Sequence, residues 1–503
     1  MEIQKLQTLI GRSAKVKALG RLLADEGLRE IRLEGLVASA APVMFSALTE
    51  KCPEALTQPY LFVMDDEEQA GYFYHDMTQI LGTEQVYFLP SSFRRAVKYG
   101  QRDAGNEILR TDALSALTNG SDAGSESRSK VYFDYAEQQG GKDREAGLNV
   151  KTENGELSTP SASLVPPVSG GQRKTENGKL VRSTLDAQHS TLNAPLFIVT
   201  YPEALTERVV SKRELQEHTI GLAVGDCLDI KVLQKRLMEQ GFRRTDYVYE
   251  PGQFAVRGSL VDVYSFSCEH PYRIDFFGDE IDSIRTFDVQ SQLSVERLQE
   301  VRIVPELAQN EGERISILEF LPEGTRLVMR DRAFLCDEVE RIWQEGFSLS
   351  ARIVEMEEGG ADGEESEKLV REQILTEPDK FRHRLLDFRT ILLGTASTGG
   401  ANLSFGISPQ PVFHKNFNLL TRELLRYQQE EYDIYILADS TKQTDRLESI
   451  FHDMQLGIRF KAVEKTLHEG FVDHDRKLVV FTDHQIFDRF HKYNLRWENA
   501  RQG

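Results

Sequence analysis

A loop near the start of the chain has the position of a phosphate-binding loop but not its residues. It follows an apolar run, begins at Gly35 and leads into a helical pattern at Pro42. A working loop of the form GxxxxGKS or GxxxxGKT needs a second glycine for close backbone approach, a lysine for the phosphates and a hydroxyl for magnesium. Ala40, Ala41 and Pro42 occupy these positions, and proline also removes a backbone donor. We therefore expect no ATP hydrolysis here, whether this is a degenerate phosphate loop or an ordinary helix start.

A second candidate site lies on a strand-like segment at residues 272–277, where alternation sorts the side chains onto two faces. One face is apolar, as expected for a side against a core, and holds Tyr272, Ile274 and Phe276. The other face mixes charged and aromatic residues, namely Arg273, Asp275 and Phe277. Arginine beside an aromatic side chain is typical of a protein–protein hot spot. The pattern alone leaves open that Phe277 packs inward and that arginines pair with Asp275 or Glu280.

The composition opposes several other functions. A net charge of −19 over 503 residues argues against a protein that wraps DNA with a basic surface. The four cysteines are scattered and form no CxxC pair, so we expect neither a metal site nor a disulfide framework, and a reducing compartment is the default. No apolar run reaches membrane length, and the first residues lack a signal-peptide core. These features predict a cytoplasmic protein.

Two groups of residues are weaker candidates. Basic side chains after residue 93 could touch phosphate, but on an acidic chain they are more typical of a solvated turn; they are Arg94, Arg95 and Lys98. A catalytic role for His468 with Glu469, or for His484 with Asp483, lacks a supporting constellation.

Strand-length apolar runs alternate with helical patterns in the first part of the chain. The runs are Ile31–Val37, Tyr60–Asp65, Gln85–Pro90 and Leu196–Thr200. The helical patterns are Pro42–Lys51, Glu67–Leu81, Asp103–Leu117 and a helix opened by Pro202. This alternation predicts a parallel sheet covered on both faces. A chain of this length is expected to hold about three or four domains.

Residues 119–194 change in character, because Gly, Ser, Gln, Glu and Lys dominate and Lys151–Gly155 recurs as Lys174–Gly178. Such a segment buries too little apolar surface to offset chain entropy, which predicts a disordered insertion. The repeat could instead be a peptide docking motif.

Residues 212–292 read as a β-rich domain with one helix, capped by Asp229 and ended by Gly241, and with a turn at Gly278-Asp279. Val301–Val304 and Thr325–Met329 are expected to return to the first sheet. A small α/β domain is expected from Ala401. Its helix is marked by Phe417, Leu420, Leu424 and Tyr427, and its strands are Tyr432–Ala438, Ile458–Val463 and Lys477–Phe481.

Two segments of the β-rich part, Glu250–Gly258 and His270–Arg285, resemble the small domain shared by the excision-repair subunit UvrB and the transcription-repair coupling factor Mfd. The resemblance is weaker in the first domain and weakest at Leu467–Val472. It implies the N-terminal part of a bacterial Mfd with an α/β multidomain fold. The expected parts are a degenerate RecA-like domain (1–211 and, with a helical linker, 293–400), an inserted β-rich domain that binds UvrA (212–292), and a small α/β domain (401–503).

The resemblance also assigns residues and partners. Carried over by matching motifs, the UvrA-binding residues are Arg257, Arg273 and Phe277. The implied role is to recruit UvrA in transcription-coupled repair, as a monomer without a cofactor of its own. In the family, ATP, magnesium, double-stranded DNA and RNA polymerase are used by the full-length translocase, through domains expected to follow this chain. By the same alignment, Leu327–Arg332 replaces a magnesium-binding strand, and Asp331 is read as a surface ion-pair residue.

Two alternatives remain. An active UvrB-type damage-verifying ATPase is opposed by the loop at Ala40–Pro42 and by the segment after Leu89-Pro90, which lacks the Tyr-rich hairpin that UvrB inserts there. A regulatory scaffold, whose UvrA-binding surface is masked in the full-length protein, is compatible with the recruitment role.

Overall fold

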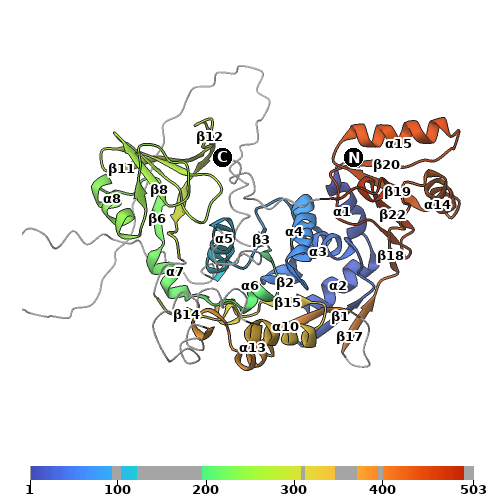
Figure 1. The fold of residues 1–503 in the computed structure, drawn as a ribbon, viewed down its shortest axis with the longest axis horizontal. Coiled ribbons are helices and arrows are strands. Elements are labelled where there is room, and N and C mark those ends of the chain that lie inside the picture. Colours follow the sequence, from blue (N-terminus) through green and yellow to red (C-terminus); the bar gives the residue numbers. More distant parts are fainter. Residues whose placement is uncertain are drawn as a thin grey trace, which may run out of the picture. The chain divides into compact units, whose positions relative to one another are not determined.

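The structure is a computed structural model that describes residues 2–92, 104–121, 195–307, 312–345, 371–394 and 400–491. Arg94, Arg95 and Lys98 lie outside the described residues. So does the predicted insertion, apart from residues 119–121, which belong to a helix instead. The elements are labelled in Figure 1.

Seven parallel strands form the first sheet, which confirms the α/β prediction. Their order is β17-β1-β16-β15-β2-β4-β3. They are β1 (Glu30–Glu34), β2 (Tyr60–Val63), β3 (Val86–Phe88), β4 (Phe197–Thr200), β15 (Arg326–Met329), β16 (Arg389–Leu393) and β17 (Ala401–Ser404). Strands β2, β4 and β15 are buried at every position, which explains their continuous apolar runs.

Helices cover both faces of this sheet, because neighbouring residues of one strand enter different cores. Tyr60 and Phe62 pack with helices α1 to α4, whereas Leu61 and Val63 pack with α5, α10 and α13. The helices are α1 (Ile3–Gly11), α2 (Ala14–Ala24), α3 (Ala40–Lys51), α4 (Glu67–Leu81), α5 (Ala104–Ser121), α6 (Pro202–Thr206), α9 (Ile317–Phe320), α10 (Arg332–Glu345) and α13 (Pro378–Leu385). Helix α4 has the predicted bounds, whereas α1 and α2 were not anticipated.

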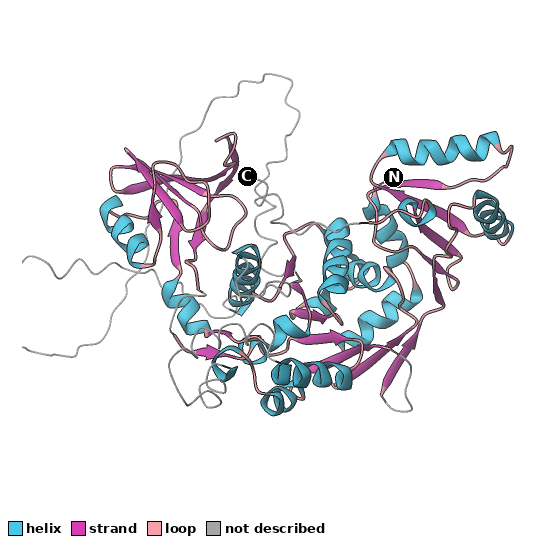
Figure 2. Cartoon of the chain, viewed as in Figure 1, coloured by secondary structure: helices cyan, strands magenta, loops and turns pink. Residues whose placement is uncertain are grey.

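The β-rich part is a six-stranded sheet of order β12-β11-β10-β9-β8-β7. Figure 2 draws strands in magenta and helices in cyan. Its strands are β7 (Arg243–Arg244), β8 (Gln253–Arg257), β9 (Leu260–Val263), β10 (Tyr272–Phe277), β11 (Glu280–Phe287) and β12 (Ser294–Leu298). Helix α8 (Ile230–Glu239) begins after Asp229, whose side chain accepts from Lys231 N, and packs Leu233 and Leu237 into the same core. The sheet continues past the expected boundary at 292, since β12 follows it.

The expected return of Val301–Val304 to the first sheet is wrong. Strand β13 (Glu300–Ile303) pairs antiparallel with β6 (Ile220–Ala223) in a separate two-stranded sheet. A second short antiparallel pair joins β5 (Val209–Val210) to β14 (Arg314–Ile315). Helix α7 (Lys212–His218) follows β5 in the sequence. Strand β15 does join the first sheet, as expected.

The last part is a five-stranded sheet of order β18-β21-β22-β19-β20. Its strands are β18 (Ile407–Pro409), β19 (Asp433–Ala438), β20 (Lys461–Glu464), β21 (Phe471–Asp473) and β22 (Leu478–Thr482), and its helices are α14 (Phe417–Gln429), α15 (Thr441–Asp453) and α16 (Asp483–Ile486). The boundary at 401 needs correction, because β17 pairs with β1 of the first sheet. Strands β18 and β21 were missed.

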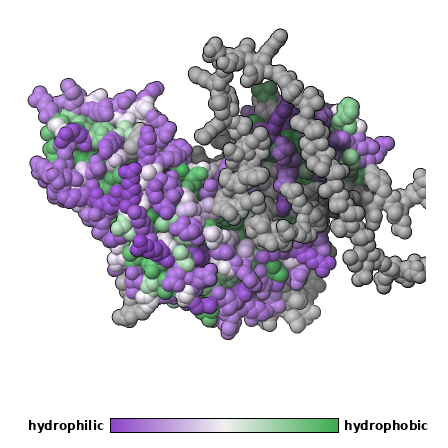
Figure 3. Space-filling view, turned by 180° about the vertical axis from the view of Figure 1, so that it is seen from behind, coloured by the Kyte–Doolittle hydropathy of each residue, from purple (hydrophilic) through white to green (hydrophobic). Residues whose placement is uncertain are grey.

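Hydrophilic residues cover most of the coloured surface in Figure 3, and hydrophobic residues show between them. Among the described residues, no helix combines the length and the apolar character needed to cross a bilayer.

Candidate functional site

The outer face of the six-stranded sheet carries the residues that the sequence analysis singled out. Strand β10 alternates as predicted, with Ile274 and Phe276 buried in the core and Arg273 on the opposite face. Phe277 ends this strand beside Gly278, which has a φ of 67°, and is 83% exposed. The alternative that Phe277 packs inward is therefore wrong.

Both arginines of this face converge on one carboxylate. Strand register places Asp262 of β9 directly opposite Arg273 of β10, and Arg257 of β8 two residues further along the same face. Nε of Arg273 donates to Oδ1 of Asp262 at 2.7 Å, Nη2 donates to Oδ2 at 2.9 Å, and Nη2 of Arg257 also donates to Oδ2. The alternative that the arginines pair with Asp275 or Glu280 is therefore wrong, because both pair with Asp262.

Asp262 was missed by sequence reasoning, although a signal for it existed. Its neighbours Val261 and Val263 are fully buried, so alternation places Asp262 on the outer face. A carboxylate in a strand flanked by valines requires a cationic partner when it is buried, and the structure leaves only 2% of this side chain exposed.

The segment interpreted from the sequence as a degenerate phosphate loop lies between β1 and α3. Gly35 has a φ of 81°, and a Cβ there would lie 2.2 Å from the carbonyl oxygen of Phe405. The first helical residues, Ala40 and Ala41, are buried in a hydrophobic cluster that also contains Leu467. A segment from the last part of the chain lies beside the start of α3, because Glu469 is hydrogen-bonded to Ser39, the residue before this helix.

Hydrogen bonds fix this contact. Ser39 Oγ donates to Oδ2 of Asp76 at 2.5 Å, and the backbone N–H of His468 donates to Oδ1 of Asp76 at 2.7 Å. The backbone N–H of Glu469 donates to Ser39 Oγ at 2.9 Å. Burial raises the pKa of Asp76 to about 7, although the bonds from Ser39 and His468 oppose this rise. The hydroxyl at the end of the loop is thus engaged by protein groups.

Histidines gather beside this contact. The ring of His468 stacks on Tyr72 with centroids 3.3 Å apart, and the ring of His484 stacks on His491 at 4.5 Å. Burial lowers the pKa of His468 to about 3 and that of His484 to about 4. Such rings are neutral at pH 7 and poorly matched to general acid–base catalysis. Within the described ranges, no group of His, Cys, Asp and Glu is arranged to hold a metal ion.

Asp331, interpreted from the sequence as an ion-pair residue, forms no ion pair among the described residues. Its carboxylate accepts from the backbone N–H of Ala333 at 2.7 Å, at the start of α10. The arginines on either side pair elsewhere, Arg330 with Asp65 at 3.1 Å and Arg332 with Glu30 at 3.4 Å. Asp331 therefore has a capping role.

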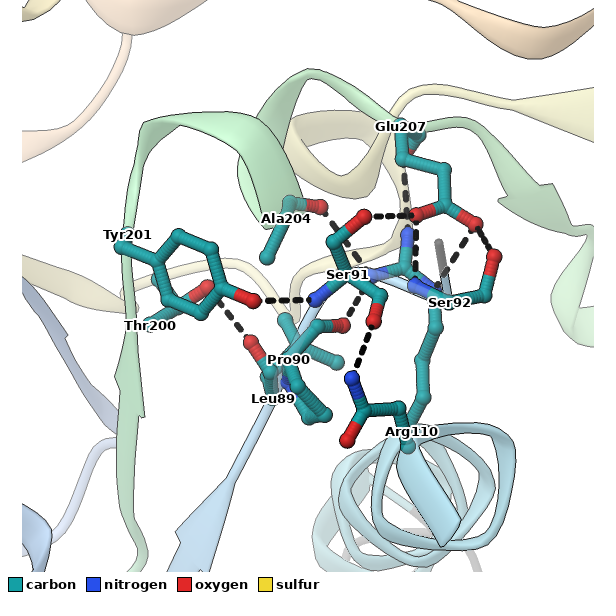
Figure 4. A network of polar contacts seen from close by, with 10 residues as sticks. Leu89, Pro90, Ser91, Ser92, Arg110, Thr200, Tyr201, Ala204 and Glu207 are labelled. Carbon is teal, nitrogen blue, oxygen red and sulfur yellow. Dashed lines mark hydrogen bonds and ion pairs between the residues drawn. The ribbon is translucent and has the colours of Figure 1, made fainter. Parts of the chain in front are cut away.

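A buried polar network holds the chain where it leaves β3 (Figure 4). The carboxylate of Glu207 accepts from Ser91 Oγ at 3.1 Å and from the backbone N–H of Ser92 at 2.9 Å. The guanidinium of Arg110 donates to the carbonyls of Pro90, Ala204 and Glu207 at 2.8, 3.1 and 3.0 Å. Because these groups satisfy one another, the network anchors the backbone and is not a candidate for catalysis.

Comparison with known proteins shows which proteins this chain is similar to. A family described as the UvrB interaction domain matches residues 220–308. The transcription-repair-coupling factor of Haemophilus influenzae is 35% identical over 128 residues, which are 25% of this chain and 11% of that protein. That of Escherichia coli is 40% identical over 101 residues, 20% of this chain and 9% of that protein.

A longer match reaches beyond the β-rich part. The transcription-repair-coupling factor of Bacillus subtilis is 24% identical over 353 residues, which cover 57% of this chain and 29% of that protein. The chain therefore spans less than a third of the length of these curated relatives.

Proposed function

We propose that this chain, which resembles the N-terminal part of the transcription-repair coupling factors, serves transcription-coupled repair by recruiting the damage sensor UvrA. The contact surface is the outer face of the six-stranded sheet. One observation carries the proposal: Phe277 is 83% exposed on a face that also presents Arg257, within the region matched by the UvrB interaction domain.

The chemistry of this face suits a protein partner. A phenylalanine that becomes buried at the centre of an interface contributes about 2–4 kcal/mol. Arg257 keeps 35% of its side chain exposed and stacks over Tyr247 at 4.9 Å from the ring centroid. A guanidinium held in this way offers a planar fork to a carboxylate of the partner.

The chain is further proposed to hydrolyse no ATP. Support comes from the residues of the phosphate loop, which supply neither lysine nor magnesium ligand, and from the contact that Leu467–Gly470 makes with the start of α3. The family's translocase activity, with its ATP, magnesium, double-stranded DNA and RNA polymerase, is proposed only for the full-length protein. A cytoplasmic location and a monomeric state are proposed on the same basis.

Binding to UvrA tests the proposal. Phe277→Ala is expected to weaken UvrA binding by about tenfold or more in isothermal titration. Its melting temperature should stay within a degree or two of wild type, because the side chain has few contacts to lose. Phe490→Ala is the matched control, since Phe490 is 81% exposed but lies after α16. Equal affinities for wild type and Phe277→Ala would reject this face as the docking surface.

A nucleotide titration tests the second part. Adding ATP and magnesium to the chain is expected to give neither saturable binding nor phosphate release. Saturable hydrolysis that survives mutation of the UvrA face would favour the alternative of an active damage-verifying ATPase.

A further inference from the structure

We infer that Asp262 and Arg273 form a buried support that orients Arg257 toward the partner, so that Arg273 is a positioning residue and Arg257 the contacting cation. The inference rests on the proposed function of this face and divides its residues into two roles.

Arg273 has little left to offer a partner. Of the five N–H donors of a guanidinium, Nε and one Nη2 proton point at Asp262, and the other Nη2 proton points at Oε1 of Gln292 at 3.1 Å. Nη1 lies 3.4 Å from the carbonyl oxygen of Gln292. The guanidinium also packs over the ring of Phe287 at 4.1 Å, and only 12% of the side chain is exposed.

Arg257 is placed differently. Among the described residues its guanidinium has one hydrogen-bond acceptor, Oδ2 of Asp262, so most of its donors remain unused. The same bond and the ring of Tyr247 fix its direction. A long side chain that is already held loses less conformational entropy when it binds.

The local charge also points to Arg257. Two cations share one carboxylate, which leaves an excess positive charge at this cluster. Because Arg273 is bidentate to Asp262 and nearly buried, the unneutralised charge lies on the more exposed Arg257. A carboxylate of UvrA placed at Arg257 would complete the neutralisation, which is the geometry that arginine favours.

The backbone keeps Arg257 and Phe277 in a fixed relation. The N–H of Phe276 donates to the carbonyl of Ser259 at 3.0 Å, and Ser259 Oγ donates to Asp275 at 3.1 Å. These bonds tie the β8–β9 turn to the end of β10. The exposed ring and the oriented cation therefore lie at the same end of the sheet.

A double-mutant cycle tests the division of roles. Arg257→Ala should weaken UvrA binding by about tenfold and lower the melting temperature less than Asp262→Asn does, because Arg273 still pairs with Asp262. Asp262→Asn and Arg273→Lys should each lower both the affinity for UvrA and the melting temperature. Asparagine removes the charge that holds both arginines, and lysine cannot reproduce the bidentate fork of Arg273. In the Arg257→Ala background, Asp262→Asn and Arg273→Lys should cost no further affinity, although each still lowers the melting temperature.

The outcomes separate this inference from the proposed function. If the affinity losses of Arg257→Ala and Arg273→Lys add, Arg273 contacts UvrA directly and the positioning role is wrong. If Asp262→Asn leaves affinity intact in the wild-type background, the support is structural only and the inference also fails. In either case a loss of binding in Phe277→Ala would leave the docking face itself standing. Each variant is measured in the complete chain at a temperature at which it is folded.

Discussion

Asp76 gives the sharpest test of the contact between α4 and the segment Leu467–Gly470. The carboxylate is 2% exposed and accepts from Ser39 Oγ and from the backbone N–H of His468. Asparagine has nearly the same shape, can keep an acceptor toward His468, and does not titrate. The difference in stability between wild type and Asp76→Asn therefore isolates the carboxylate.

The expected pH dependence follows from the raised pKa of Asp76. The unfolded chain releases its proton near the ordinary pKa of 3.8, whereas the folded chain keeps it until the pKa of about 7. Between these values the native state binds more protons, so wild-type stability falls as pH rises. The whole interval corresponds to about 4 kcal/mol, and the part between pH 5.5 and 7 to about 2 kcal/mol. Asp76→Asn should gain that amount over wild type across that range.

Urea unfolding of both proteins at pH 5.5, 6, 7 and 8 measures this difference, and hydrogen exchange of the peptide that contains His468 reports the contact locally. Asp76→Ala serves as a second variant, because it leaves two donors without an acceptor, at about 1–3 kcal/mol each. A stability difference between wild type and Asp76→Asn that is the same at every pH would refute the reasoning. The carboxylate would then be solvated, and the contact would not form as described.

Two further predictions concern the scaffold. Gly35→Ala should lower the free energy of unfolding by more than about 2 kcal/mol, because its Cβ would meet the carbonyl oxygen of Phe405. Gly82→Ala is the matched control, since Gly82 has a φ of 80° and a Cβ added there would have no atom within 4 Å. Equal losses of stability for the two variants in thermal unfolding would contradict the close approach at Gly35. Glu207→Ala should cost about 3–5 kcal/mol, because it removes the carboxylate oxygen that lies 3.8 Å from Nε of the buried Arg110. Glu207→Gln should cost less, since the amide oxygen can still accept hydrogen bonds. A loss below about 1 kcal/mol for Glu207→Ala in circular-dichroism melts would show that the network is not buried.

The sequence predicted an element best where the residues of that element alone determine its structure. Helix α4 was predicted to the residue, because its periodicity is bounded by the N-cap Asp66 and by Gly82. The fully buried strands β2 and β4 gave unbroken apolar runs. Alternation predicted the inward direction of Phe276, whereas it left the direction of Phe277 open until the structure showed its exposure.

It failed where a partner came from elsewhere in the chain. Strand β13 has an ordinary strand pattern, but only its pairing with β6 excludes it from the first sheet. The pairing of Arg257 and Arg273 with Asp262 depends on strand register, which the composition of one strand does not determine. The contact of Asp76 with His468 joins residues 392 positions apart, and no local pattern contains that information.

The same contact lies at the loop whose residues depart from the phosphate-binding pattern. Ala41 stands at the lysine position of the loop, is 5% exposed and shares a hydrophobic cluster with Leu467. A lysine there would carry an ammonium group into a buried position, and burying a charge costs several kcal/mol unless a partner compensates it. The small apolar side chains of Ala40 and Ala41 suit this buried position at the start of α3.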